Sequence, residues 1–293
     1  MTISSSSLLH YEVIGPDHAA TIVLIQGLGL SALAWPSAFI EHFLSQGYRL
    51  VLIDNRDCGL SPVYDHLPNP NLGKLILNKA LGVVGRSSAS YQLDDMADDV
   101  VAILDVLNIA RAHVVGISMG GMIAQLLALN YPHRVSSLTS IMSTTGERRA
   151  SMPSTRLLRL LMRTRPGERD ERIAEAFSFW QLLSSPDYPT HHDEVFERLN
   201  QFYDRGYHPQ GTMRQLAAII TAKPRFKALQ QCAVPAMVLH GSHDPLVPLI
   251  GGRRTAAALR VPLKIYQGMG HELPPGLDRV VAADITEHLT RST

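Results

Sequence analysis

The chain has 293 residues, of which 45% are hydrophobic and 18% are charged, a composition that suits a globular protein with a sizeable core. A formal net charge of +1 gives no reason to expect nucleic acid or an anionic membrane surface as a partner. The N-terminal residues are polar and no apolar run is long enough to span a bilayer, so we expect a cytoplasmic protein without a signal peptide. Cys58 and Cys232 stand far apart and are expected to be free thiols.

Short apolar segments alternate with amphipathic segments along most of the chain. Their Val, Ile and Leu content predicts strands at residues 8–14, 21–26, 48–54, 114–117, 138–142, 236–240 and 263–267. The amphipathic segments predict helices at residues 34–46, 93–107, 119–131 and 277–290. Strands separated by helices in this way indicate an α/β fold with a mostly parallel, doubly wound sheet.

The alternation stops between residues 146 and 226. This stretch has almost no strand signal, and its apolar segments predict helices at residues 157–162, 174–183, 195–202 and 213–221. We therefore expect a helical cap of residues 146–226, inserted after the sixth strand, over a core of residues 1–145 and 227–293. A shorter insertion, residues 62–90, is expected to add a wall to the same pocket.

The residues Gly116-Ile117-Ser118-Met119-Gly120 stand between a predicted strand and a predicted helix. A serine with glycines two places before and two places after it is typical of a nucleophile elbow, a sharp turn that holds the hydroxyl above a sheet. Glycine is needed at both flanking positions because any side chain there would collide with the strand and the helix. The pattern predicts Ser118 as a nucleophile.

A serine hydroxyl needs an adjacent base, and the base needs an acid that orients it. In the elbow arrangement the acid and then the histidine follow the serine along the chain. Asp244 follows the predicted strand 236–240, and His271 follows the last predicted strand. We expect these two residues to complete a catalytic triad with Ser118.

The other candidates for the acid and the base are weaker. Glu272 adjoins His271, but neighbouring residues on a loop rarely face each other. His240 and His243 flank the acid loop, but they belong to the strand of the acid and do not follow the last strand. His191 and His192 are not within a metal-binding motif and are expected to lie in loops or at the surface. No metal ion or other cofactor is expected.

Two backbone amides should stabilise the oxyanion that forms when the serine attacks. One is the amide of Met119, the residue after the nucleophile. The other is the amide of Leu28, which stands between Gly27 and Gly29 in the loop after residues 21–26, expected to be the third strand. The two glycines allow the backbone to turn the Leu28 amide toward the serine.

Taken together, these residues resemble the α/β-hydrolase superfamily over nearly the whole chain. The segments at 54–61 and 129–135 are also similar to motifs of that superfamily, although Asp57 stands where glycine is usual. Gln26 replaces the histidine that many relatives carry at the oxyanion loop. The turn at Asp57, the Trp35-Pro36 pair and residues 268–271 look most like the aclacinomycin methylesterase branch, which itself resembles macrolide esterases.

The resemblance implies a carboxylic ester hydrolase that forms an acyl-enzyme on Ser118. Bulky polyketide or macrolide esters and lactones are the substrates that the branch suggests. Enol-lactone hydrolysis, C–C bond hydrolysis and perhydrolysis use the same triad and stay open, as does a non-catalytic ligand-binding protein on this scaffold. The only expected partner is a small-molecule ester or lactone, with the chain as a monomer or homodimer.

Aromatic residues are the expected lining of the substrate pocket. Trp35, Phe177 and Trp180 are the predicted substrate-binding residues, and Phe179, Phe202 and Tyr203 are further candidates. The start of the predicted cap is rich in arginine, with residues Arg148, Arg149, Arg156, Arg159, Arg163, Arg165, Arg169 and Arg172. These arginines are expected to form a solvated helical face, with attraction of an anionic substrate as the alternative.

Overall fold

The computed structural model describes residues 8–83, 89–147, 153–162 and 167–292. Seven strands form one sheet in the order β1-β3-β2-β4-β5-β6-β7. Only the edge pair β1 and β3 is antiparallel. The strands are β1 (Tyr11–Ile14), β2 (Thr21–Ile25), β3 (Arg49–Ile53), β4 (Ala112–Ile117), β5 (Val135–Ile141), β6 (Ala236–Gly241) and β7 (Leu263–Tyr266). The predicted mostly parallel α/β sheet is confirmed.

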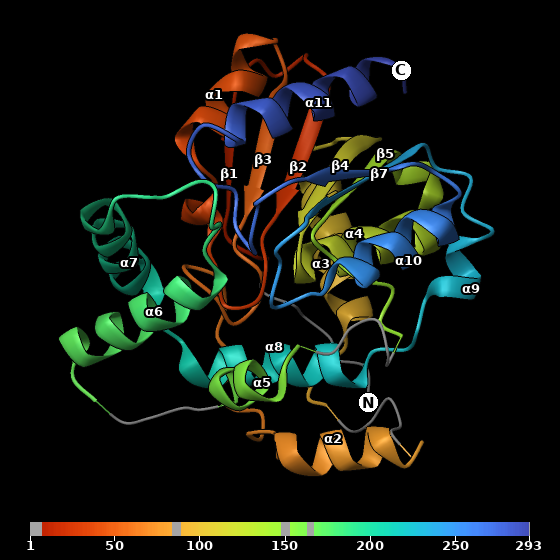
Figure 1. Ribbon diagram of the computed structural model, residues 1–293. Coiled ribbons are helices and arrows are strands. Elements are labelled where there is room, and N and C mark those ends of the chain that lie inside the picture. Colours follow the sequence, from red (N-terminus) through yellow and green to blue (C-terminus); the bar gives the residue numbers. More distant parts are fainter. Residues whose placement is uncertain (1–7, 84–88, 148–152, 163–166, 293) are drawn as a thin grey trace.

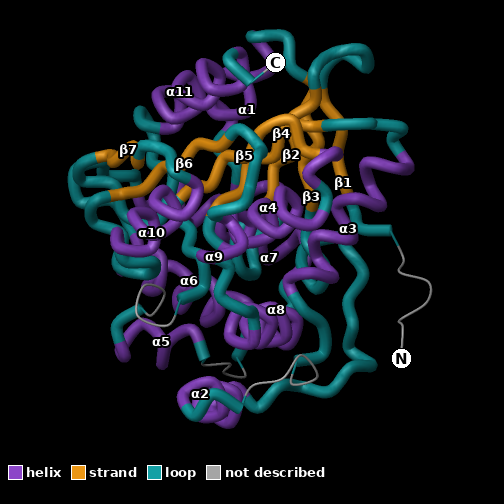
Figure 2. The backbone as a smooth tube through the Cα atoms, turned by 90° about the vertical axis from the view of Figure 1, so that its right-hand side faces the viewer, coloured by secondary structure: helices purple, strands orange, loops and turns teal. Residues whose placement is uncertain are grey.

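Helices cover both faces of this sheet, as Figure 2 shows. On one face lie α1 (Ser37–Ser45) and α11 (Asp278–Thr290), and on the other α3 (Leu93–Val106), α4 (Met119–Asn130) and α10 (Leu249–Leu259). A separate apolar core lies on each face of the sheet. The side chains of β2 alternate between them, with Ile22 and Leu24 in one core and Val23 and Ile25 in the other. Because both faces are buried, the strand is an uninterrupted apolar run.

The helix α10 is the large core helix that the sequence did not predict. It contains Gly251 and Gly252, which weaken a helical pattern. The structure explains Gly252, because a Cβ at that position would lie 2.5 Å from Nδ1 of the buried His240. Close packing of α10 against β6 therefore depends on a residue that obscures the helix in the sequence.

The described residues between β5 and β6 form helices, which lie together at one end of the sheet in Figure 1 except for α9. They are α5 (Thr155–Leu161), α6 (Arg169–Leu183), α7 (His192–Gly206), α8 (Pro209–Thr221) and α9 (Phe226–Leu229). The segment follows the fifth strand, so the expected position after the sixth was wrong, as was the third-strand position of the oxyanion loop. One strand, β1, comes before Thr21 among the described residues, as the strands predicted at 8–14 and 21–26 imply, so the strand positions were correct and only their count was wrong.

The remaining helices lie in connections around this end of the sheet or between core elements. They are the short 3-10 turns η1 (Ala32–Ala34) and η3 (Pro132–Arg134), and α2 (Leu72–Ala80). Leu72 and Leu75 of α2 pack in a small apolar cluster with Met213 and Leu216 of α8. The insertion 62–90 is therefore attached to the outside of α8.

A buried ion pair joins α8 to the loop that follows β3. Arg214 donates to both carboxylate oxygens of Asp57, with Nε–Oδ2 and Nη2–Oδ1 distances of 2.8 and 2.7 Å. The hydroxyl of Tyr91 donates a further hydrogen bond to Asp57. Asp57 has a φ of 65°, the left-handed region that favours glycine and that aspartate tolerates better than most residues. The ion pair with Arg214 thus accounts for an aspartate at position 57, where the resemblance noted above would place glycine.

His113 on β4 is held in the core beside Ser137, whose hydroxyl is 2.8 Å from Nδ1 of the imidazole. Burial, with the charges of His288 and Arg111, lowers the pKa of His113 to about 4. Below the ordinary histidine pKa of about 6.5 the unfolded chain takes up this proton and the folded chain does not. Folding stability is therefore lost as the pH falls from about 6.5 to about 4, by about 3 kcal/mol.

We expect urea unfolding midpoints of the wild-type protein to fall across this pH range, and those of His113→Asn to fall less. Asparagine keeps a polar group beside Ser137 but has no proton to bind. The exposed His133 provides the control, because His133→Asn should retain the full wild-type slope. Identical slopes for His113→Asn and wild type would contradict the assignment.

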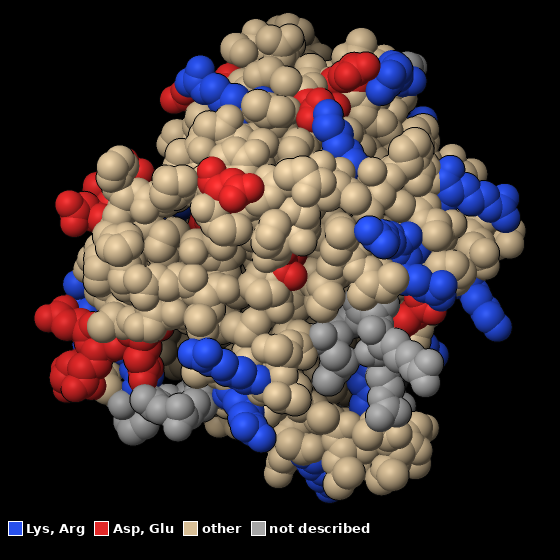
Figure 3. Space-filling model, in the orientation of Figure 1, with Lys and Arg blue, Asp and Glu red and all other residues tan. Residues whose placement is uncertain are grey.

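Among the described residues, no helix is both long enough and apolar enough to cross a membrane. Figure 3 shows acidic side chains gathered at the edge formed by α6 and α7, with basic side chains spread over other parts of the same face. The visible surface is therefore mixed in charge and carries no single large basic patch on this side.

Candidate active site

Ser118 sits in a strained turn between β4 and α4. Its φ and ψ are 55° and −118°, an uncommon conformation for a residue with a side chain. A Cβ at Gly116 would lie 2.2 Å from the carbonyl oxygen of Gly120, and a Cβ at Gly120 would lie 2.0 Å from that of Ile25. Both distances are below any real contact, which is the steric reason for the glycines that the sequence pattern requires.

The structure brings the three predicted triad residues together in one chain of hydrogen bonds. The hydroxyl of Ser118 is 3.0 Å from Nε2 of His271. On the other side of the ring, Nδ1 of His271 is 2.7 Å from Oδ2 of Asp244. This geometry lets His271 accept the serine proton while its Nδ1–H donates to the carboxylate.

Asp244 is fixed by its own backbone. Its Oδ1 accepts hydrogen bonds from the amides of Leu246 and Val247 at 2.9 and 2.8 Å. Burial raises the pKa of this carboxyl, but the charge of His271 and hydrogen bonds from His240 and His271 outweigh burial, so the pKa lies below its ordinary value. The carboxylate therefore stays ionised and can stabilise a positive charge on His271.

His240 was expected on the strand before Asp244, and the structure places it there. It lies on β6, is fully buried, and its Nε2 is 2.8 Å from the carbonyl oxygen of Val247 and 3.4 Å from Oδ2 of Asp244. His240 thus contacts two residues of the loop that carries the catalytic acid, Asp244 and Val247. The strand position of residues 236–240 was the available signal, because alternate residues of a central strand face the core.

The loop after β2 lies directly against Ser118. A Cβ at Gly27 would be 3.2 Å from the Cβ of Ser118. The amides on either side of Leu28 are occupied, because Gly27 donates to Oε1 of Gln26 at 3.1 Å and Gly29 donates to Oε1 of Gln215 at 2.8 Å. No hydrogen bond among the described residues uses the amide of Leu28, so it is available as a donor beside the serine.

Met119 is the first residue of α4, so its amide has no partner within the helix. No hydrogen bond among the described parts of the chain uses this amide either. The positive end of the helix dipole is at the same place. Gln26 and Gln215 therefore orient one candidate donor loop, and the start of α4 supplies the other donor.

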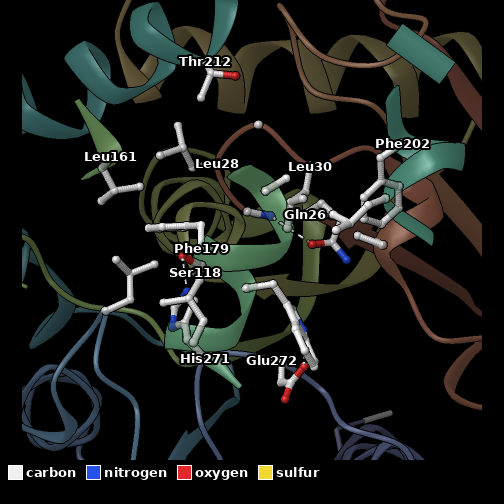
Figure 4. Close-up of a pocket in the computed structure, with 18 of the residues that line it drawn as sticks. Gln26, Leu28, Leu30, Ser118, Leu161, Phe179, Phe202, Thr212, His271 and Glu272 are labelled. Atoms are coloured by element: carbon white, nitrogen blue, oxygen red, sulfur yellow. Dashed lines mark hydrogen bonds between the residues drawn. The ribbon is translucent and has the colours of Figure 1, made fainter. Parts of the chain in front are cut away.

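A pocket of about 410 Å³ adjoins Ser118 and His271, as the close-up in Figure 4 shows. Its walls come from the loop after β2 and from the helices between β5 and β6. Phe179, Trp180 and Phe202 line it, in agreement with their expected place. Leu28 lines it, as do leucines that the sequence did not single out, namely Leu30, Leu160, Leu161, Leu183, Leu199, Leu246 and Leu273.

Two of the predicted substrate-binding residues lie elsewhere. Trp35 is 3% exposed and stacks on Phe39 within the core under α1 and α11, so its assignment to the pocket was wrong. Phe177 stacks on Phe196 of α7, with ring centroids 4.2 Å apart, and does not line the pocket. Tyr203 stacks on Tyr207 instead. Phe177 and Trp180 lie one turn apart on the same side of α6, with ring centroids 5.7 Å apart, so only the docking of that helix decides which of them reaches the pocket.

A second cavity of about 180 Å³ also reaches Ser118. It shares Leu28, Ser118, Leu161 and Leu246 with the large pocket. The helix α2 contributes Ile76, Lys79 and Ala80 to this cavity and nothing to the large pocket. The insertion 62–90 was expected to wall the same pocket as the other helices, and it walls this second cavity instead.

Glu272 connects the histidine loop to α6. Its Oε2 accepts from Nε1 of Trp180 and its Oε1 accepts from the amide of Ser185, both at 2.8 Å. The amide of His271 also donates to the carbonyl of Leu183 at 2.8 Å. Glu272 is thus no rival to Asp244 as the acid, and it positions the loop that carries His271.

We expect Glu272→Gln to lower kcat about tenfold and stability by about 2 kcal/mol, because an amide group would face a hydrogen-bond donor where a carboxylate oxygen now accepts. Trp35 and Trp180 are the only tryptophans, and Trp35 is buried in the core, so a red shift in tryptophan emission would report on Trp180. The exposed Glu194 gives a matched control, Glu194→Gln. Unchanged emission and kcat in Glu272→Gln would show that Glu272 does not position this loop.

Two of the described arginines near the start of this segment are paired with carboxylates. Arg169 pairs with Asp204 at 2.8 Å and Arg172 pairs with Glu175 at 2.8 Å. Arg156 and Arg159 lie on α5, and Arg148, Arg149, Arg163 and Arg165 lie outside the described residues. Within the described ranges, no group of three or more His, Cys, Asp or Glu side chains is placed to bind a metal ion.

Comparison with known proteins gives one family. Residues 20–274 match the family model described as alpha/beta hydrolase fold. Rhodomycin D methylesterase DauP of Streptomyces sp. (strain C5) is 30% identical to the chain over 96% of its length and 95% of the relative. Rhodomycin D methylesterase DnrP of Streptomyces peucetius is 29% identical over 100% and 98% of the two chains.

Solved structures share the fold at lower identity. A meta-cleavage product hydrolase (CumD) superposes with a TM-score of 0.75 at 20% identity, covering 98% of both chains. The enol-lactonase from Burkholderia xenovorans LB400 superposes with a TM-score of 0.71 at 21% identity, covering 96% of both chains. At 20% and 21% identity, these two structures show that the fold is shared and nothing further.

Proposed function

The chain belongs to the α/β-hydrolase family, and on that basis we propose that it is a serine hydrolase of carboxylic esters that acts through an acyl-enzyme on Ser118. The observation that carries the proposal is the continuous hydrogen-bond chain from Ser118 through His271 to Asp244. Nucleophile, base and orienting acid are the groups that acyl transfer needs, and they need no cofactor.

In the proposed reaction, the Ser118 hydroxyl attacks the ester carbonyl while Nε2 of His271 takes the hydroxyl proton. The amides of Leu28 and Met119 donate to the oxyanion of the tetrahedral intermediate, each contributing about 3–4 kcal/mol. His271 then gives the proton to the leaving alcohol. A water molecule, deprotonated by His271, attacks the acyl-enzyme and releases the acid, which restores the Ser118 hydroxyl.

The substrate we propose is an ester or lactone with a large apolar group. A pocket of about 410 Å³ lined by aromatic and aliphatic side chains fits such a group. Two relatives over nearly the whole chain are named rhodomycin D methylesterases, which makes bulky polyketide esters the first substrates to test. We further propose that residues 146–226 act as a cap that determines which esters enter.

C–C bond hydrolysis is the second candidate. A 2-hydroxy-6-oxononadienedioate/2-hydroxy-6-oxononatrienedioate hydrolase of Burkholderia vietnamiensis is 29% identical over 90% of this chain. Such chemistry needs the same serine, histidine and oxyanion donors. Parallel assays with an ester and a vinylogous 1,5-diketone therefore separate the two activities.

A fluorophosphonate probe tests the proposal directly, because it labels only an activated serine. We expect stoichiometric labelling of the intact protein and none of Ser118→Ala. A panel of 4-nitrophenyl esters, methyl esters of polycyclic acids, and macrolides should then give the substrate class. Absence of labelling in the folded wild-type protein would favour a ligand-binding protein that carries an idle triad.

A further inference from the structure

The second cavity is a largely apolar space with one lysine, Lys79, in its lining. Its lining is mostly aliphatic and includes Met122, Leu158, Leu216, Ile219 and Ile220. At about 180 Å³ it is close in size to an engineered protein cavity that holds benzene, so it accepts a group of roughly six or seven heavy atoms. One end of this space is at Ser118, and α2 supplies Lys79.

The position of His271 decides which half of an ester enters this cavity. In the tetrahedral intermediate the oxyanion faces the amide donors and the leaving oxygen must face the histidine, which protonates it. His271 lines the large pocket and does not line the second cavity. The alcohol therefore extends into the large pocket, and the acyl chain extends into the second cavity.

Lys79 has no carboxylate partner among the described residues, since no ion pair or side-chain hydrogen bond involves it. Burial and the charge of Arg225 lower the pKa of Lys79, which indicates that its ammonium group is partly removed from water. A desolvated cation without a counter-ion is costly, and an anionic ligand removes that cost.

A second cation stands behind the wall of this cavity. Arg225 donates to Oε1 of Gln125 at 3.1 Å and to the carbonyl of Thr144 at 3.0 Å, so its acceptors there are uncharged. Thr144 and Gly146 line the cavity, and a Cβ at Gly146 would lie 3.6 Å from Nη1 of Arg225. The nearby carboxylate of Glu147 is engaged by both donors of Arg254, at 2.7 and 2.8 Å.

We propose that the second cavity is the acyl site and that Lys79, supported by Arg225, binds a negatively charged group at the far end of the acyl chain. The preferred substrate is then an ester between a bulky apolar alcohol and a short acid with a second, terminal carboxylate. This inference rests on the proposed esterase function. In a methyl ester of a bulky acid the large group is on the acyl side. The substrate inferred here has the opposite arrangement, with the large group on the alcohol side.

The test compares two esters of equal size and unequal charge, mono-4-nitrophenyl adipate and 4-nitrophenyl 6-methylheptanoate, after subtraction of spontaneous hydrolysis. We expect wild-type kcat/KM to be at least tenfold higher for the adipate ester. Lys79→Met should lower kcat/KM for that ester about 10- to 100-fold, the size of one charged hydrogen bond, and change the neutral ester less than threefold. Lys79→Arg should restore most of the preference.

Lys74 on the exposed side of α2 gives the matched control, because Lys74→Met removes the same charge from the same helix away from the cavity. Ile219→Phe and Leu158→Phe each narrow the cavity, and either should reduce turnover of both long-chain esters relative to 4-nitrophenyl acetate. Equal turnover of the charged and neutral esters by wild type, or equal loss of both in Lys79→Met, would overturn the inference.

If the chain is not an esterase, the experiments give a different result from those above. In that case no ester is hydrolysed and the fluorophosphonate does not label Ser118. Hydrolysis of methyl esters of bulky acids in preference to the adipate ester would leave the esterase standing and overturn the orientation.

Discussion

Ser118→Ala is expected to lower kcat for the best ester roughly a millionfold, the scale measured when a triad serine is removed elsewhere. The substitution removes only an oxygen atom, and alanine meets the same backbone strain at φ 55° as serine does. The fold should therefore be unchanged by circular dichroism and thermal unfolding. Stopped assays with high enzyme concentration and a sensitive ester are needed to measure the residual rate.

The same reasoning predicts how the triad residues combine. His271→Ala should cost about as much as Ser118→Ala, and the double variant should be no slower than either single variant, because the two groups act as one unit. Asp244→Asn keeps the shape but removes the charge that orients His271, and about 10⁴-fold loss is expected. Losses that simply multiply in the double variant would mean that Ser118 and His271 do not act together.

Arg214→Met is expected to destabilise the protein by about 3–5 kcal/mol, because it leaves the buried carboxylate of Asp57 without its cation. For a chain of this size the melting temperature should fall by about 5–8 °C. Gln215, the next residue, holds the amide of Gly29 in the oxyanion loop at 2.8 Å. We therefore also expect kcat to fall about tenfold below the melting temperature, as the donor loop loosens.

The double variant Asp57→Asn/Arg214→Met provides the control. Asparagine accepts the positive φ at position 57 and needs no counter-ion, so the double variant should recover most of the lost stability. Equal instability of the single and double variants would mean that Arg214 contributes by packing alone. Calorimetric scans of the wild type and both variants measure this directly.

The same ion pair has a pH signature. Burial raises the pKa of Asp57, but hydrogen bonds from Arg214, the Tyr64 amide and Tyr91 outweigh burial, so the folded pKa lies below the usual value. Stability from this carboxylate is present above its unfolded pKa, about 4, and is lost as the pH falls through the lower folded value. The stability gap between wild type and Arg214→Met should narrow as the pH is lowered.

The three triad residues could be predicted from the amino-acid sequence because they depend on backbone sterics and on the order of the strands. A Cβ at Gly116 would lie 2.2 Å from the Gly120 carbonyl within the turn, and one at Gly120 would lie 2.0 Å from the Ile25 carbonyl on the adjacent strand β2. Asp244 and His271 each follow a parallel strand, and parallel strands end at the same edge of a sheet. The helical segment between β5 and β6 follows five strands, which agrees with the predicted strand positions, so the error was in counting it after the sixth.

The residues that line the two cavities could not be predicted from the sequence in this way. Phe177 and Trp180 stand one turn apart on α6, yet only Trp180 lines the large pocket. Trp35 has the aromatic character of a pocket residue and instead fills the core beside Phe39. Helical periodicity gives each helix an apolar side, but the contacts that cover that side come from residues far away in the chain.

The sequence by itself therefore determined the sheet, the elbow and the identity of the three residues in the hydrogen-bond chain, since these depend on short-range sterics and on the order of strands. Only the tertiary structure decided which partner Asp57 has, where Glu272 binds, and that Lys79 lies in a cavity reaching Ser118. These features join segments that are remote in sequence, and their energies depend on how α2, α6 and α8 dock on the sheet. Substrate choice belongs to this second group.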